Sequence, residues 1–140
     1  MEGQASRACR ASLGSHIEVE LIYKESFQFL AETRNQIRSV MERFGLCPDW
    51  QEWVLEDTMI PKYVARYPSA TILVNEKDIC PEIRFAKGSS NRIYVSSLGS
   101  VSEIPSKVYF GQGIREALDS ALFSNAAIEV YSSLKHREIL

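Results

Sequence analysis

The sequence has few of the residues on which metal and disulfide chemistry depend. Its 140 residues include only 2 histidines and 3 cysteines. His16 and His136 have no cysteine or histidine three to five residues away, so the spacing of a structural zinc site is absent and no metal is expected. Three scattered cysteines do not suit a disulfide-stabilised scaffold and instead indicate a reducing compartment.

The sequence also lacks an excess of either charge and any long hydrophobic run. The 16 basic and 18 acidic residues leave a net charge of only −2, which does not favour binding to nucleic acid or to an anionic membrane. No stretch approaches the roughly 20 apolar residues of a membrane helix, and the first fifteen residues lack the apolar core of a secretory signal. We therefore expect a cytoplasmic protein with one globular domain, preceded by a flexible tail over residues 1–15.

The first structured region changes its hydrophobic period within a few residues. Residues 17–23 alternate with a period of two, which predicts a strand, although Glu18 and Glu20 place carboxylates on one of its faces. Either this strand overhangs the sheet or it is not central. Apolar residues then recur at helical spacing, with Ser26 as the expected N-cap and Gly45 as the residue that ends the helix.

Short strands and helices alternate through the rest of the chain. Residues 50–56 predict a second strand with Trp50 and Trp53 on opposite faces, and "SATILVN" predicts a central strand covered on both faces. The other expected elements are a short helix at 59–67, paired strands at 83–86 and 92–96, a loop at 97–106, and helices at 111–123 and 125–137. The element order β-α-β-α-β-β-α, with one helix appended, predicts an α/β fold with a mixed sheet.

Three segments carry a resemblance to a known family. The segments "VELIYKESFQFLAETRNQIRSVM", "GLCPDWQEWVLED" and "YPSATILVNEKDI" together resemble a family of small bacterial thioredoxin-like proteins, and "NRIYV", "EIPS" and "GIREAL" continue the match to about Leu122. The resemblance implies a thioredoxin-like βαβαββα domain over residues 16–124. Residues 125–140 then form an additional C-terminal helix.

The departures from the family bear on function. The family carries one or two cysteines at the strand–helix junction, where a helix N-terminus lowers a thiol pKa. Phe27 and Leu30 hold those two positions, so no dithiol exchange is expected there. Asn91 stands at a further cysteine position. Ala70 replaces a cis-proline, and we expect a trans peptide bond because a non-proline cis bond costs about 3 kcal/mol.

These departures predict a non-redox binding or interaction module rather than an enzyme. The candidate binding residues surround the junction and are Tyr23, Phe27, Phe29, Leu30 and Ala70. Phe27 and Phe29 either line a groove or fill the vacated site as part of the core. A pocket at Phe27 would alternatively suit a carrier of apolar small molecules. No cofactor is expected, because the Gly-x-Gly of residues 111–113 lacks the third glycine of a dinucleotide loop.

Two further features leave alternatives open. Cys47 and Cys80 each precede a proline, and the resemblance places both at the pole opposite the junction, where either could serve a single-thiol redox enzyme or sensor. The C-terminal helix has a narrow apolar face, which predicts a homodimer interface as readily as packing on its own sheet. The sequence names neither the ligand nor the partner.

Overall fold

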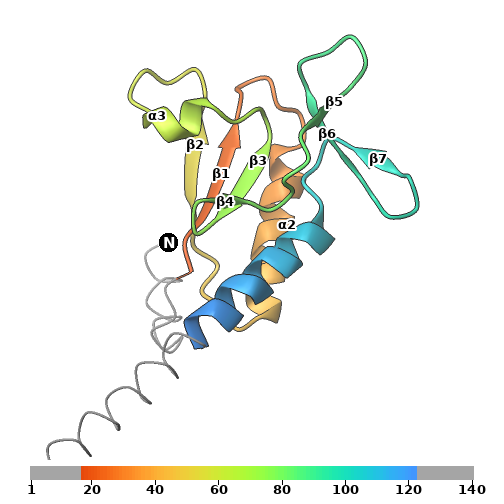
Figure 1. Ribbon diagram of the computed structural model, residues 1–140. Coiled ribbons are helices and arrows are strands. Elements are labelled where there is room, and N and C mark those ends of the chain that lie inside the picture. Colours follow the sequence, from red (N-terminus) through yellow and green to blue (C-terminus); the bar gives the residue numbers. More distant parts are fainter. Residues whose placement is uncertain (1–16, 123–140) are drawn as a thin grey trace, which may run out of the picture.

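The computed structural model describes residues 17–122, which form a mixed α/β structure (Figure 1). The strands of the main sheet are β1 (Val19–Tyr23), β2 (Gln51–Val54), β3 (Thr71–Val74) and β4 (Lys77–Asp78). They lie in the order β2-β1-β3-β4, with β1 parallel to β2 and antiparallel to β3. The expected central position of the "SATILVN" strand, now β3, is confirmed.

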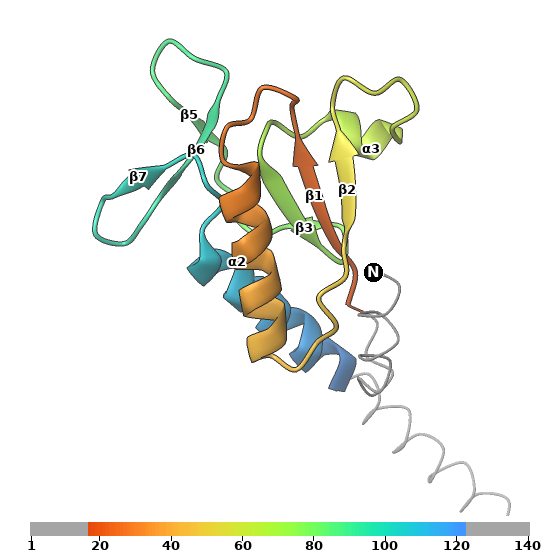
Figure 2. The same ribbon diagram turned by 180° about the vertical axis from the view of Figure 1, so that it is seen from behind.

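Helices cover the two faces of this sheet unequally. α2 (Leu30–Arg43) and a helix over residues 107–122 lie on one face, and the short α3 (Lys62–Ala65) lies on the other (Figures 1 and 2). The larger core lies beneath the two long helices and includes Leu21, Ile37, Ile72, Phe110 and Ile114. The smaller core lies beneath α3 and contains Ile22, Val64 and Leu73. The face beneath α3 is therefore the less protected one.

The C-terminal end of α2 follows the sequence prediction. Gly45 has a φ of +72°, a left-handed conformation that glycine adopts without a Cβ clash. Its N–H donates to Glu42 O at 3.0 Å, and the N–H of Leu46 donates to Met41 O at 2.9 Å. This pair of bonds satisfies carbonyls that the helix end would otherwise leave unpaired. The role of Gly45 as the residue that ends the helix is confirmed.

A second, smaller sheet projects to one side of the main one (Figure 1). Its strands are β5 (Arg84–Phe85), β6 (Arg92–Val95) and β7 (Val101–Ser102), all antiparallel in the order β5-β6-β7. The expected pairing of residues 83–86 with 92–96 is confirmed, but the segment expected to be a loop at 97–106 contains β7. The fourth strand of the main sheet is β4, whose two residues are too few to leave a period of two in the sequence.

The two carboxylates near the start of β1 have different environments. Glu18 precedes the strand and is exposed, whereas Glu20 lies within the central strand and is only 6% exposed. The overhang interpretation is thus right for Glu18 and wrong for Glu20. A buried carboxylate in a central strand requires a local explanation.

Several expectations lie outside the described residues. These are the N-terminal tail over residues 1–15 and the helix at 125–137, together with both alternatives for that helix, a homodimer interface and packing on its own sheet. Within residues 17–122, no helix combines the length and apolar character needed to cross a membrane.

Candidate functional site

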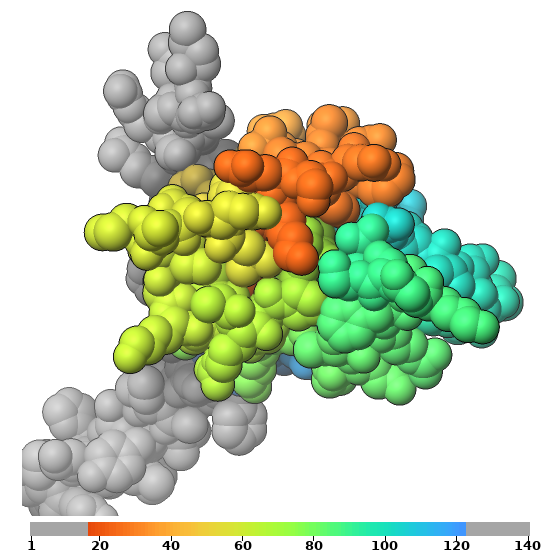
Figure 3. All heavy atoms as spheres, turned by 90° about the horizontal axis from the view of Figure 1, so that it is seen from above, coloured from red at the N-terminus to blue at the C-terminus, as the bar shows by residue number. Residues whose placement is uncertain are grey.

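The junction between β1 and α2 forms one wall of a pocket. After Tyr23 the chain turns, with the N–H of Phe27 donating to Lys24 O at 2.9 Å. α2 then begins at Leu30, with Phe29 as its N-cap residue and no side-chain capping bond. The expectation that Ser26 caps this helix is wrong, because the turn occupies residues 24–27 and delays the first helical residue. In Figure 3 the junction lies between the loop after β2 and the region of the β5–β6 hairpin.

The opposite wall is the segment that enters β3. The Ser69–Ala70 peptide bond is cis, so the expected trans bond is wrong. Hydrogen bonds hold the segment on both sides of this bond. Ser69 accepts from the N–H of Lys24 at 3.0 Å and, through its carbonyl, from the N–H of Arg92 at 3.1 Å. The hydroxyl of Tyr94 donates to the carbonyl of Ala70. These partners come from distant parts of the chain, so local sequence could not indicate them.

The pocket between these walls has a volume of about 370 Å³. The residues that line it are Lys24, Ser26, Phe27, Gln28, Ser69, Asn91, Arg92 and Glu103. Phe27 is the only apolar side chain in this set, and neither a cysteine nor a histidine belongs to it. The pocket therefore offers hydrogen-bond donors and acceptors, and its charged lining residues are Lys24, Glu103 and Arg92, the last of which is paired with Asp78.

Of the five residues proposed from the sequence, only Phe27 lines this pocket. Phe27 is half-buried, and it also packs against the larger core, as does Leu30. Phe29 meets Phe27 edge to face, with ring centroids 6.1 Å apart. Tyr23 and Ala70 belong to the larger core itself. Phe27 was expected either to line a groove or to join the core, and in the structure it does both.

Tyr23 extends from the core toward a polar cluster on β2. Its hydroxyl donates to Glu52 Oε1 at 3.4 Å. Burial raises the pKa of Tyr23, and the negative charge of Glu52 raises it further. Tyr23 therefore stays protonated and serves as a structural donor.

No pattern in the sequence indicated the central role of Arg92. Its side chain is completely buried, pairs with Asp78 at 2.9 Å and donates to Thr71 Oγ1 at 2.7 Å. The same guanidinium donates to the carbonyl of Cys80 at 2.6 Å and lies 4.7 Å from the centroid of the Tyr94 ring. Arg92 thereby joins β6 of the small sheet to β3 and β4 of the main sheet. Among apolar neighbours in "NRIYV" an arginine is expected to face solvent, which is why this contact was missed.

The two candidate thiols do not lie at one pole. Cys47 follows the C-terminal end of α2, whereas Cys80 lies beside the start of β3, where the guanidinium of Arg92 bonds its carbonyl. The expectation that both lie opposite the junction is therefore wrong for Cys80. Cys80 is buried and its thiol lies 3.5 Å from Glu82 O, while Cys47 is half-buried. Neither forms a disulfide within residues 17–122.

Metal ligands do not gather in the part of the chain that the structure describes. No group of three or more His, Cys, Asp or Glu side chains there could hold a metal ion. The carboxylate of Asp78 is engaged by the guanidinium of Arg92.

Comparisons with known proteins add no relative. No family model, no curated protein and no solved structure matches this chain.

Proposed function

We propose that this chain is a thioredoxin-like domain without dithiol chemistry, which acts as a binding module through the pocket at the β1–α2 junction. The ligand is a polar molecule or polar peptide segment. The observation that carries the proposal is the pocket itself, which lies at the end of a central strand and is lined by donors and acceptors but by no thiol.

The sheet supports the thioredoxin-like part of the proposal. A β1-α-β2 unit with parallel strands, followed by the antiparallel β3 and β4, gives the order β2-β1-β3-β4. A turn joins the end of β1 to the start of α2, and this junction is where the resemblance places the family's cysteines. Phe27 and Leu30 stand there in this chain, and neither can exchange a disulfide.

The lining of the pocket favours a polar ligand over an apolar one. An apolar ligand would have to desolvate Lys24, Gln28 and Asn91 without replacing their hydrogen bonds to water, which costs free energy for each group. A polar ligand replaces these hydrogen bonds to water with hydrogen bonds of its own. The alternative of an apolar carrier with its pocket at Phe27 therefore loses support.

The proposal does not include a single-thiol enzyme or sensor that uses Cys80. Cys80 is buried among partners that fix its backbone, and reactive cysteines need an accessible thiolate. A homodimer through the C-terminal helix remains a prediction, since that helix lies outside the described residues.

Backbone-amide NMR tests the binding site. We expect polar fragments such as small amides, amino acids and hydroxy acids to shift the amide signals of residues 24–28, Ser69 and Asn91. An Asn91→Ala variant removes an exposed polar group from the rim and should weaken binding several-fold. Asn35→Ala, the same change at an exposed position of α2, should leave it unaltered. Shifts confined to other surfaces, or equal effects of the two variants, would contradict the proposal.

A further inference from the structure

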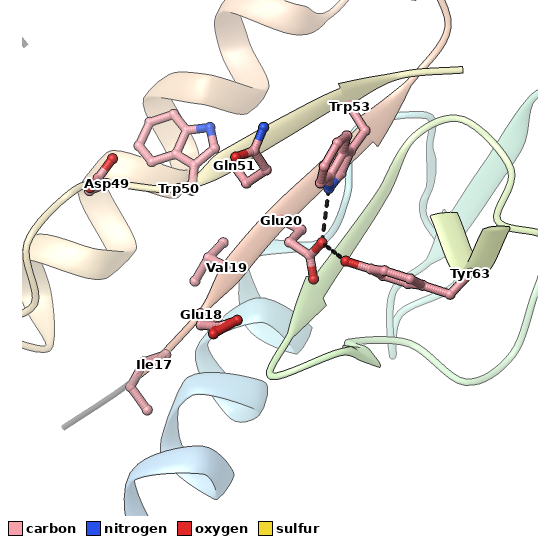
Figure 4. Close-up of a pocket in the computed structure, with 9 residues that line it drawn as sticks. All are labelled: Ile17, Glu18, Val19, Glu20, Asp49, Trp50, Gln51, Trp53 and Tyr63. Atoms are coloured by element: carbon pink, nitrogen blue, oxygen red, sulfur yellow. Dashed lines mark hydrogen bonds between the residues drawn. The ribbon is translucent and has the colours of Figure 1, made fainter. Parts of the chain in front are cut away.

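A second pocket lies on the sheet face that α3 leaves partly uncovered. Its volume is about 430 Å³, and its walls come from the starts of β1 and β2 and from α3 (Figure 4). Trp53 and Tyr63 stand on either side of the Glu20 carboxylate, as Figure 4 shows. Glu18 and Asp49 add two more carboxylates to the lining. This pocket shares no lining residue with the one at the junction.

Glu20 is held in a defined position at the base of this pocket. Its Oε1 accepts a hydrogen bond from Trp53 Nε1 at 2.9 Å and another from the hydroxyl of Tyr63. Both bonds use the same oxygen, and the structure gives Oε2 no hydrogen-bond partner within residues 17–122. Oε2 is not sealed from solvent either, because in the same residues the only fully buried polar side-chain atom without a partner is Arg92 Nε.

No cationic side chain of residues 17–122 neutralises Glu20. The ion pairs of the described chain join Arg34 to Glu52, Arg84 to Glu82 and Arg92 to Asp78, and none reaches Glu20. A carboxylate that is 6% exposed and lacks a counter-ion is costly, since buried charges are normally paired. The free-energy cost of burying the Glu20 charge is offset if a cationic ligand serves as its counter-ion.

The neighbours of Glu20 donate hydrogen bonds without neutralising its charge. The hydrogen bond to the Glu20 carboxylate raises the pKa of Tyr63, and partial burial raises it further. Tyr63 therefore remains a neutral phenol at neutral pH. The indole N–H of Trp53 is a donor that carries no charge. The full negative charge of Glu20 is left for a cation beside two aromatic rings.

We propose that this pocket binds an organic cation that carries N–H donors, namely a primary alkylammonium group. The ammonium donates to Glu20 Oε2, and its alkyl chain and charge rest against the aromatic side chains, which attract cations through their ring faces. Glu18 and Asp49 at the margin attract the cation at longer range. The proposal is independent of the function assigned to the junction pocket.

The position of the tryptophans supplies a direct readout. The chain has only 2 tryptophans, and both Trp50 and Trp53 line this pocket. Titration of the full chain with n-butylammonium should change the tryptophan fluorescence with saturation. n-Butanol, which has nearly the same shape and no charge, should bind at least about tenfold more weakly. An equal response to the two compounds would overturn the proposal.

A variant pair assigns the effect to Glu20. Glu20→Gln keeps an oxygen to accept from Trp53 and Tyr63 but removes the charge, and should weaken n-butylammonium binding at least about tenfold. Glu42→Gln makes the same change on an exposed residue of α2 and should leave the affinity unaltered. Unchanged affinity in Glu20→Gln would refute the site.

Two further arms keep the test decisive. If Glu20→Gln does not fold, amide NMR of the unaltered protein replaces it. n-Butylammonium must then shift Glu20, Gln51 and Trp53, and shifts confined to Lys24 or Asn91 would overturn the proposal. Nα-acetyl-lysine N-methylamide represents a lysine side chain of another protein, and n-butylammonium represents a free amine. Tighter binding of the first compound would indicate a lysine side chain as the ligand, and tighter binding of the second would indicate a free amine.

Discussion

Arg92 is the largest completely buried side chain of the described chain. Its charge is balanced by Asp78, which is itself only 11% exposed, and its donors reach Thr71 and the carbonyl of Cys80. Only its Nε has no partner within residues 17–122. A buried pair of this kind adds little net stability over an apolar pair, but removing one partner leaves the other charged and desolvated.

Replacing Arg92 therefore has a large expected effect. Arg92→Met should lower the free energy of unfolding by about 3 kcal/mol, because Asp78 and the carbonyl of Cys80 lose their donor. Equilibrium denaturation in urea measures this change. Arg84→Met is the control, since Arg84 lies on the same hairpin in an exposed pair with Glu82 and should cost less than about 0.5 kcal/mol. Similar costs for the two variants would show that Arg92 does not hold the sheets together.

Single residues also mark the limit of what the sequence could predict about the site. With packing in the core as the alternative, Phe27 was named as a candidate binding residue because it stands at the strand–helix junction, where the resemblance places a cysteine. Arg92 and Glu103 were not, because they reach the pocket through the second sheet. The cis bond before Ala70 was missed for a similar reason, since the hydrogen-bond partners of Ser69 and Ala70 are the distant residues Lys24, Arg92 and Tyr94.

At the level of elements, Glu52 connects β2 to α2. Arg34 of α2 donates two hydrogen bonds to this carboxylate, from Nε to Oε2 at 2.9 Å and from Nη2 to Oε1 at 2.7 Å. The indole of Trp50 adds a third bond to Oε2 at 2.9 Å. The bonds from Arg34 lower the pKa of Glu52, while burial opposes them.

The interaction of Glu52 with Arg34 should make the free energy of unfolding depend on pH. A carboxyl whose pKa is lower in the folded protein than in the unfolded chain stabilises the fold fully above the ordinary value of 4.5, and the contribution is lost as the pH falls below it. Glu52→Gln should cost about 1 kcal/mol at pH 7, with the partial exposure of Arg34 limiting the effect. The cost should shrink toward zero below pH 4.

Thermal unfolding between pH 3 and pH 7 checks the expectation. Glu42→Gln, an exposed change on α2, should leave the difference from the parent protein constant across this range. A cost of Glu52→Gln that does not change with pH would contradict the role given to the carboxylate.

The elements that the sequence predicted well are those that bury an apolar face over several residues. α2 buries Ile37, Val40 and Met41 in one stripe, and β3 is buried along its whole length. The missed elements, β4 and β7, have two residues each and owe their pairing to neighbours rather than to a period. The strand expected at residues 92–96 is present and pairs with its expected partner, β5, but it lies in the second sheet, where it also pairs with β7.

At the scale of the whole molecule, the junction pocket and the Glu20 pocket lie at opposite ends of β1. The junction pocket lies where β1 ends, and the Glu20 pocket lies where β1 begins, on the face that α3 covers only in part. For the first, the change of hydrophobic period predicted the strand–helix junction, and of the five candidate residues named there only Phe27 lines the pocket. The second was present in the sequence only as carboxylates that did not suit a central strand, and its aromatic neighbours come from β2 and α3.

The proposed thioredoxin-like character of the junction can be tested by placing cysteines at the two positions where the resemblance expects them. Phe27→Cys with Leu30→Cys places two cysteines at the N-terminal end of α2, where the helix dipole stabilises a thiolate. Ser39→Cys with Glu42→Cys gives the same spacing at exposed positions near the opposite end of α2, where the dipole disfavours a thiolate.

Reduction of insulin disulfides, with dithiothreitol to regenerate the dithiol, is the most direct measurement. The parent chain should show no activity above dithiothreitol alone, and the Phe27→Cys/Leu30→Cys protein should gain a several-fold faster rate that the Ser39→Cys/Glu42→Cys control lacks. Activity in the parent that is lost on replacing a native cysteine would contradict a non-redox module. A restored pair no faster than the control would contradict the thioredoxin-like assignment of the junction.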